Sequence, residues 1–128
     1  MDMYREEILE HWQNPQNFGV INNADLVIEQ VNPLCGDEVT FYFKIEGGKI
    51  KDAKFTGSGC AISIASASIL SENIRNKKIS TLTKITGEDV LKLIGGSVAP
   101  ARLKCAFLAL EALRRAQGKP LRKVQGKQ

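Results

Sequence analysis

EVTFYFKIEGGKIKDAKFTGSGC, residues 38–60, contains two segments of alternating apolar and polar residues joined by Gly47 and Gly48. Alternation of this kind predicts two strands that each bury one face, and a two-residue glycine turn favours an antiparallel hairpin. In the second segment Ile50 is out of phase with Ala53 and Phe55, which predicts a β-bulge near Lys51. This hairpin is the centre of the expected fold.

The segments on either side extend the hairpin into a mixed structure. DLVIEQV, residues 25–31, predicts a third strand. Apolar residues at helical spacing, with capping signals at Thr86 and Pro100, predict helices over residues 4–12, from Cys60 onward, over 87–94 and over 101–117. We therefore expect an α+β fold, a three-stranded antiparallel sheet with the helices packed on one face.

Length and charge limit the classes of protein to consider. The 128 residues fit one domain, which we place at residues 1–118, followed by a basic tail at 119–128. The net charge of +4 comes largely from that tail, which has no aromatic residues for base stacking, so we expect no nucleic-acid partner. No apolar run is long enough for a membrane span and the acidic N-terminus is unlike a signal peptide, so we expect a cytoplasmic protein.

The three cysteines lie at predicted junctions between elements, and their odd number argues against a disulfide framework. Cys35 and Asp37 precede the second strand, with Gly36 between them to allow an uncommon backbone dihedral. Cys60 opens a helix, and Cys105 lies in the first turns of the last helix. The helix dipole and nearby cations are expected to favour thiolates at Cys60 and Cys105.

Three thiolates and one carboxylate form a ligand set suited to zinc or to the iron of an iron-sulfur cluster. The set is Cys35, Asp37, Cys60 and Cys105. The cysteines are 25 and 45 positions apart, unlike the close pairs of a zinc finger, so the whole fold is needed to assemble the site. The harder Asp37 ligand should weaken the binding of iron, which favours a site that holds its metal or cluster only transiently. Lys104 and Arg102 could offset the negative charge.

Simpler roles remain open for each of these residues. The cysteines could be small buried apolar residues, and Asp37 could form a turn hydrogen bond. Lys104 and Arg102 could be solvated groups on a helix surface. A thiol enzyme with a histidine base would have to recruit His11, the one histidine, from the first helix, so we leave His11 out of the site.

Three stretches resemble the U-type iron-sulfur cluster scaffold family, which comprises IscU, SufU and the N-terminal domain of NifU. They are YREEILEHWQNPQNFG (4–19), NPLCGDEVTFYFKIEGGKIKDAKFTGSGCAISIASASILSE (32–72) and ARLKCAFLALEAL (101–113). The resemblance implies that a cysteine desulfurase delivers sulfur to Cys105, that a [2Fe-2S] cluster is built from iron on Cys35, Asp37, Cys60 and Cys105, and that the cluster passes to recipient apo-proteins. It also implies a monomer or a cluster-bridged homodimer, and zinc in the isolated protein.

The chain departs from both branches of that family. Lys104 stands where IscU proteins have histidine, as in SufU, yet the chain lacks the segment that SufU-like proteins add between the second and third cysteines. VAPAR, residues 98–102, differs from the LPPVK segment by which IscU proteins engage a chaperone, so the resemblance does not extend to chaperone docking. We predict a scaffold rather than an enzyme; the alternatives are a zinc-dependent sulfurtransferase that relays persulfide and a structural zinc module.

Overall fold

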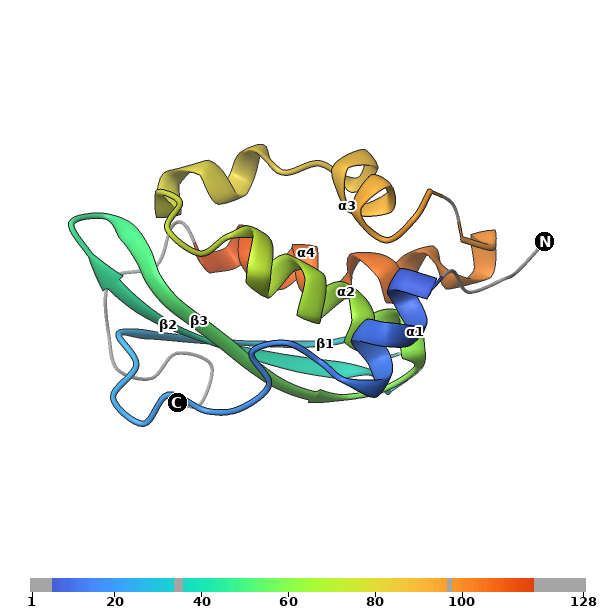
Figure 1. Cartoon of the computed structure of the whole chain (residues 1–128), viewed down its shortest axis with the longest axis horizontal. Helices are drawn as coiled ribbons and strands as arrows, with labels where there is room; N and C mark the ends of the chain where they lie inside the picture. Colours follow the sequence, from blue (N-terminus) through green and yellow to red (C-terminus); the bar gives the residue numbers. More distant parts are fainter. Residues whose placement is uncertain (1–5, 34–35, 97, 117–128) are drawn as a thin grey trace.

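The computed structural model describes residues 6–33, 36–96 and 98–116. In chain order the elements are α1 (Glu6–Gln13), β1 (Leu26–Val31), β2 (Glu38–Glu46), β3 (Lys49–Ser58), α2 (Ala61–Asn73), the 3-10 helix η1 (Ile79–Lys84), α3 (Gly87–Leu93), the 3-10 turn η2 (Pro100–Arg102) and α4 (Leu103–Ala116). The described helices lie on one side of a three-stranded antiparallel sheet, α2 and α4 directly against it and α3 farther out (Figure 1). The predicted α+β architecture is confirmed.

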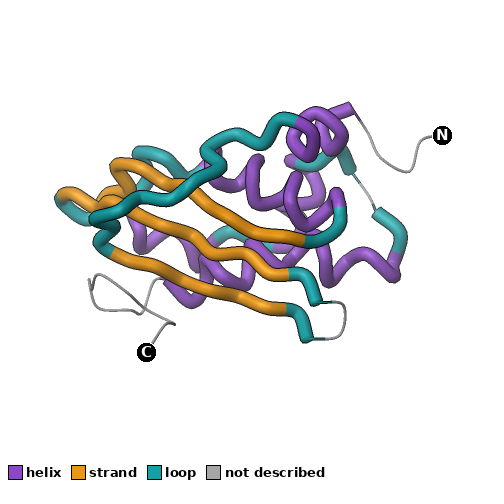
Figure 2. Tube along the Cα trace, turned by 90° about the horizontal axis from the view of Figure 1, so that it is seen from below, coloured by secondary structure: helices purple, strands orange, loops and turns teal. Residues whose placement is uncertain are grey.

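The sheet has the order β1-β2-β3, and its two pairings are antiparallel. Lys44 pairs with Asp52 and Ile45 pairs with Ile50, so Lys51 has no partner on β2. The predicted bulge is therefore present, and it turns Ile50 onto the same buried face as Ala53 and Phe55. Seen from the side opposite the helices, the end of β1, the start of β2 and the exit from β3 lie at the same end of the sheet (Figure 2).

Aromatic rings fill the centre of the layer between sheet and helices. Phe41, Phe43 and Phe55 are fully buried, and Phe41 lies 5.9 Å from each of the other two rings, measured between centroids. Their burial follows the predicted alternation of β2, whose inward face also carries Val39. A close-packed core of this kind fixes the register of the two strands, because a slip of one residue would expose the phenylalanines.

The burial of α2 exceeds what its sequence pattern predicts. Helical spacing indicated one apolar stripe, whereas every residue from Ile62 to Ser71 is buried. The reason is position, since α2 packs against α1, α4 and β3 together. Its alanines and serines let these neighbours approach closely, and Ser66 Oγ is buried without a hydrogen-bond partner among the described residues.

The predicted helices are present, with α1 ending one residue later and α3 one residue earlier than expected; the expected ends at residues 4 and 117 lie outside the described residues. Thr86 and Asp89 form the expected capping box at the start of α3. The last helix opens as a 3-10 turn at Pro100 and becomes α-helical at Leu103, and the 3-10 helix at Ile79–Lys84 was not predicted. In the described part of the chain, no helix has the length and apolar character that crossing a membrane requires.

His11 has a structural role in attaching α1 to α2. Its Nδ1 lies 2.6 Å from Ser68 Oγ, which also accepts a 2.8 Å hydrogen bond from the backbone N–H of Gln16. Ser68 is on α2 about two turns beyond Cys60. These contacts agree with leaving His11 out of the predicted site.

Ser66→Ala should stabilise the protein by about 1 kcal/mol. The substitution removes a buried hydroxyl that forms no hydrogen bond, and alanine is the better helix former. Urea unfolding of the metal-free protein measures the change. Ser71→Ala is the matched control, because Ser71 Oγ donates to the Ser68 carbonyl at 2.6 Å and accepts from Asn17 at 3.0 Å. The control variant should lose stability, and a loss of equal size in S66A would contradict the prediction.

Candidate metal centre

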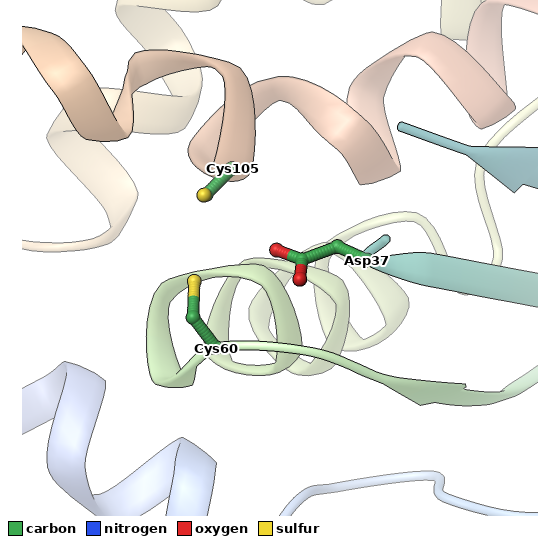
Figure 3. Close-up of side chains that lie close together, drawn as sticks. All are labelled: Asp37, Cys60 and Cys105. Atoms are coloured by element: carbon green, nitrogen blue, oxygen red, sulfur yellow. The ribbon is translucent and has the colours of Figure 1, made fainter. Parts of the chain in front are cut away.

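Asp37, Cys60 and Cys105 meet at one end of the sheet. A carboxylate oxygen of Asp37 and the two sulfur atoms all lie within 4.8 Å of one another. Asp37 directly precedes β2, Cys60 is the N-cap of α2, and Cys105 is in the first turn of α4. The three side chains point toward a common centre (Figure 3). The structure thus brings together three of the four predicted ligands from distant parts of the chain.

Cys35, the fourth predicted ligand, lies outside the described residues. The backbone on either side is closed by two 2.8 Å hydrogen bonds, from Gly36 N to Asn32 O and from Asn32 N to Asp37 O. Gly36 has a φ of +79°, the uncommon dihedral expected there. The role of Cys35 as a ligand therefore stays a prediction.

Gly59 permits the close approach of α2 to Asp37. A Cβ atom at this position would lie 2.7 Å from Asp37 Cγ and 2.8 Å from Oδ1. Gly59 also has a φ of +156°, which side-chain-bearing residues rarely adopt. The GSG sequence before Cys60 thus does more than end a strand, because it makes room for the carboxylate beside the helix N-terminus.

Asp37 is 6% exposed and is held as a carboxylate by hydrogen bonds. Burial raises its pKa, but hydrogen bonds from the Ser63 hydroxyl, the Cys105 thiol, and the backbone N–H and thiol of Cys60 outweigh burial, so the pKa lies below its usual value. A carboxylate supplied with this many donors is negatively charged at neutral pH. The simpler turn role therefore does not describe Asp37, because its main partners come from α2 and α4.

Cys105 is protonated in the metal-free protein, contrary to the thiolate expected from the sequence. Burial raises the pKa of its thiol to about 12; the hydrogen-bonding and electrostatic interaction with Cys60 and the negative charge of Asp37 act in the same direction, and a hydrogen bond with Arg102 lowers it. The expectation was wrong because it counted nearby cations and the helix dipole, but neither the 5% exposure of Cys105 nor the facing acidic groups.

The two cations singled out in the sequence are placed differently. Arg102 lies close enough to hydrogen-bond the Cys105 thiol. Lys104 is exposed and lines an open cavity of about 330 Å³ together with Asn32 and Pro33. The structure thus brings Arg102 to the site, while Lys104 lies beside the segment that leads to Cys35.

Ser63 belongs to the site and was missed in the sequence. Its Oγ donates a 2.6 Å hydrogen bond to Asp37 Oδ2 and lies 3.7 Å from Cys60 Sγ. The available signal was its spacing, since a residue three positions after an N-cap faces back toward that cap.

The donor set fits a soft, tetrahedral metal. Sulfur ligands select zinc or iron over harder cations, and ligands about 2.3 Å from a tetrahedral metal are about 3.8 Å apart. The separations within 4.8 Å require only a small contraction. Cys60 and Cys105 are free thiols, so both sulfurs are available for such binding.

A small α+β fold with thiols and a carboxylate gathered at one end of its sheet defines a class of metal- or cluster-handling protein. The chain belongs to the NifU-like N-terminal domain family, whose family model matches residues 3–126. The fold alone is also shared with the N-terminal part of a NifU-like protein from Brucella abortus, at 24% identity and a TM-score of 0.73 over 88% of this chain and 90% of that one.

Two relatives that carry functional names are similar along most of their length. The iron-sulfur cluster assembly scaffold protein IscU 1 of Archaeoglobus fulgidus is 41% identical, over 89% of this chain and 74% of that protein. The zinc-dependent sulfurtransferase SufU of Bacillus subtilis is 38% identical, over 91% of this chain and 90% of SufU. The SufU alignment spans 134 residues, more than the 128 of this chain, so SufU contains residues without a counterpart here.

A solved structure supports the same assignment. The crystal structure of FiSufU from the thermophile Fervidobacterium islandicum AW-1 superimposes with a TM-score of 0.74 at 33% identity. The match covers 88% of this chain and 95% of that one. The family prediction made from the sequence is confirmed.

The metal-free protein should lose stability as the pH rises from about 9 toward 12. The unfolded Cys105 thiol has an ordinary pKa of 9.0 and releases its proton first, whereas the folded thiol keeps it up to about 12. Over this window the folded state binds more protons, so the free energy of unfolding falls with pH. Urea unfolding at pH 8 and pH 10.5 measures the loss, and Cys105→Ala should show a smaller one. Equal losses in both proteins would contradict the assignment.

Proposed function

We propose that this chain is a scaffold for iron-sulfur cluster assembly, which receives sulfur from a cysteine desulfurase, binds iron, assembles a [2Fe-2S] cluster and passes it to apo-proteins in the cytoplasm. The observation that carries the proposal is the meeting of Asp37, Cys60 and Cys105 within 4.8 Å in a chain of this family. The similarity to IscU at 41% identity supports it. The proposed ligands are Cys35, Asp37, Cys60 and Cys105.

Cys105 is the proposed sulfur acceptor. A new S–S bond would form between the Cys105 thiolate and the terminal sulfur of a desulfurase persulfide, while the donor's S–S bond breaks and the donor cysteine leaves as a thiolate. This step requires Cys105 to lose its proton, which the buried acidic surroundings oppose in the metal-free protein. A bound divalent metal would supply the positive charge that favours the thiolate. Arg102 acts in the same direction.

Asp37 is proposed to make the bound cluster easy to release. A carboxylate is a harder and more exchangeable ligand for iron than a fourth thiolate. Its position among hydrogen-bond donors means that protein groups can compete with iron for its oxygen atoms. A carrier that must release its cargo needs such a ligand, whereas a permanent electron-transfer centre would not benefit from it.

A zinc-dependent sulfurtransferase is the second candidate, because the SufU relative is 38% identical over nine-tenths of both chains and bears that name. In that case zinc would stay bound and Cys105 would only relay sulfur. The two candidates differ in whether a cluster ever forms on the protein.

Anaerobic reconstitution with ferrous iron, cysteine, a desulfurase and a thiol reductant, which reduces persulfide sulfur to sulfide, tests the choice. The wild type should develop the visible absorption of a two-iron cluster; Cys105→Ser should not, because one thiolate is lost and serine stays protonated at neutral pH. Lys104→Ala should lower the yield only in part, since Lys104 is exposed and an ammonium cannot bind iron. A wild type that keeps its zinc, accepts sulfur at Cys105 and forms no cluster would favour the sulfurtransferase.

Asp37→Ala should slow transfer of the cluster to an apo-ferredoxin, because the exchangeable ligand that opens the site is gone. The transfer rate is followed by the change in visible circular dichroism after the two proteins are mixed. Asp89→Ala is a control for the loss of one carboxylate, since Asp89 caps α3 and lies outside the site. Transfer at the wild-type rate or faster in D37A would show that release is controlled elsewhere.

A further inference from the structure

Ser63 touches each of the three described members of the site. Its Oγ lies 2.6 Å from Asp37 Oδ2, 3.7 Å from Cys60 Sγ and 3.3 Å from the Cys105 carbonyl oxygen. The side chain is 3% exposed, so water does not replace these contacts. The three partners come from separate segments of the chain, and one hydroxyl therefore connects the start of β2, the N-cap of α2 and the first turn of α4.

The hydroxyl has one hydrogen and two acceptors within reach. The Asp37 contact is the shorter one and its acceptor is charged, so the hydrogen goes to Asp37 Oδ2 rather than to the carbonyl of Cys105. The Cys60 sulfur lies 3.7 Å from the same oxygen, and the single hydrogen of its thiol can go either to Ser63 or to Asp37. Asp37 is thus bound at Oδ2 by a buried donor.

We propose that Ser63 is a positioning residue that holds Asp37 Oδ2, so that Asp37 binds metal through a single oxygen and in a fixed orientation. This inference rests on the proposed function, because it concerns the same metal centre. Ser63 itself contributes no ligand atom. It acts by holding the Asp37 carboxylate against α2, because its hydroxyl occupies Oδ2 with a hydrogen bond and leaves the other oxygen for the metal.

The effect on affinity follows from this geometry. Donors that orient a metal-binding carboxylate change metal affinity by about 10- to 100-fold when they are removed. Without the hydroxyl, Asp37 loses the 2.6 Å donor at Oδ2, and the carboxylate is held only by the weaker contacts with Cys60 and Cys105. Either it binds through both oxygens or it leaves the metal, and the coordination geometry changes in both cases.

A double-mutant cycle tests the proposal without using cluster transfer. Zinc affinity is measured by competition with a chromophoric chelator for the wild type, Ser63→Ala, Asp37→Ala and the double variant. S63A should weaken zinc binding by about 10- to 100-fold, and the same substitution in the D37A background should have almost no effect, because Ser63 acts through Asp37. The visible spectrum of the Co²⁺-loaded protein should change in S63A but not between D37A and the double variant.

Two further variants separate positioning from folding. Ser66 lies one turn farther along the same helix, and its buried hydroxyl has no hydrogen-bond partner among the described residues. The Ser66→Ala variant should therefore bind zinc as the wild type does. Ser63→Thr keeps the hydroxyl and should restore most of the affinity lost in S63A. Unfolding measurements on every variant identify any that fail to fold, and S63T then carries the test in place of S63A through its Co²⁺ spectrum.

The outcomes distinguish this inference from the proposed function. A wild type that binds neither zinc nor Co²⁺ would contradict both. Wild-type binding together with an unchanged S63A would overturn the positioning role and leave the metal centre in place. An equal loss in the presence and absence of Asp37 would show that Ser63 only supports α2, which also overturns the inference.

Discussion

The pairing of Glu38 with Ser58 is the constraint on which the metal centre depends. Asp37 directly precedes Glu38 and Cys60 follows Ser58 by two residues, so this one pair of the antiparallel ladder places both side chains at the same end of the sheet. The register is held by burial of Phe41 against Phe55, because a shift of one residue would turn these rings to the other face. Packing in the middle of the sheet thereby fixes the positions of the Asp37 and Cys60 side chains at its end.

Burying Asp37 beside two thiols is costly, and the fold offsets this cost with donors. Desolvation of a carboxylate opposes folding unless hydrogen bonds replace water. Ser63 and the amide of Cys60 at the N-terminus of α2 provide such bonds, so the charge survives burial. The same negative charge then opposes ionisation of Cys105, which keeps that thiol neutral until a cation enters. The donors that stabilise the metal-free site thus also set the conditions for sulfur chemistry.

Sequence patterns sufficed where local chemistry decides the structure. The alternation of β2, the bulge that corrects the phase of Ile50, and the Thr86–Asp89 capping box all follow from neighbouring residues. The gathering of Asp37, Cys60 and Cys105 was also predicted, because each lies at a junction that the fold brings to one end. What the sequence could not supply depends on contacts between distant segments. The protonated state of Cys105, the complete burial of α2 and the part played by Ser63 arise only when α2, α4 and the sheet are packed together.

The site joins three segments that lie far apart in the sequence. Asp37 and Cys60 are carried by the β2–β3 hairpin and the start of α2, whereas Cys105 arrives on α4 after the 3-10 turn at Pro100–Arg102. Cys105 packs in a smaller cluster with Ile8, Ile62 and Ile94, distinct from the phenylalanine core under the sheet. A metal bound to all three ligands would cross-link the start of β2, the N-terminus of α2 and the first turn of α4, and binding to the folded state alone would stabilise that state. Metal binding and the packing of α4 on the sheet would therefore favour each other, because the distances from Cys105 to Asp37 and Cys60 depend on that packing.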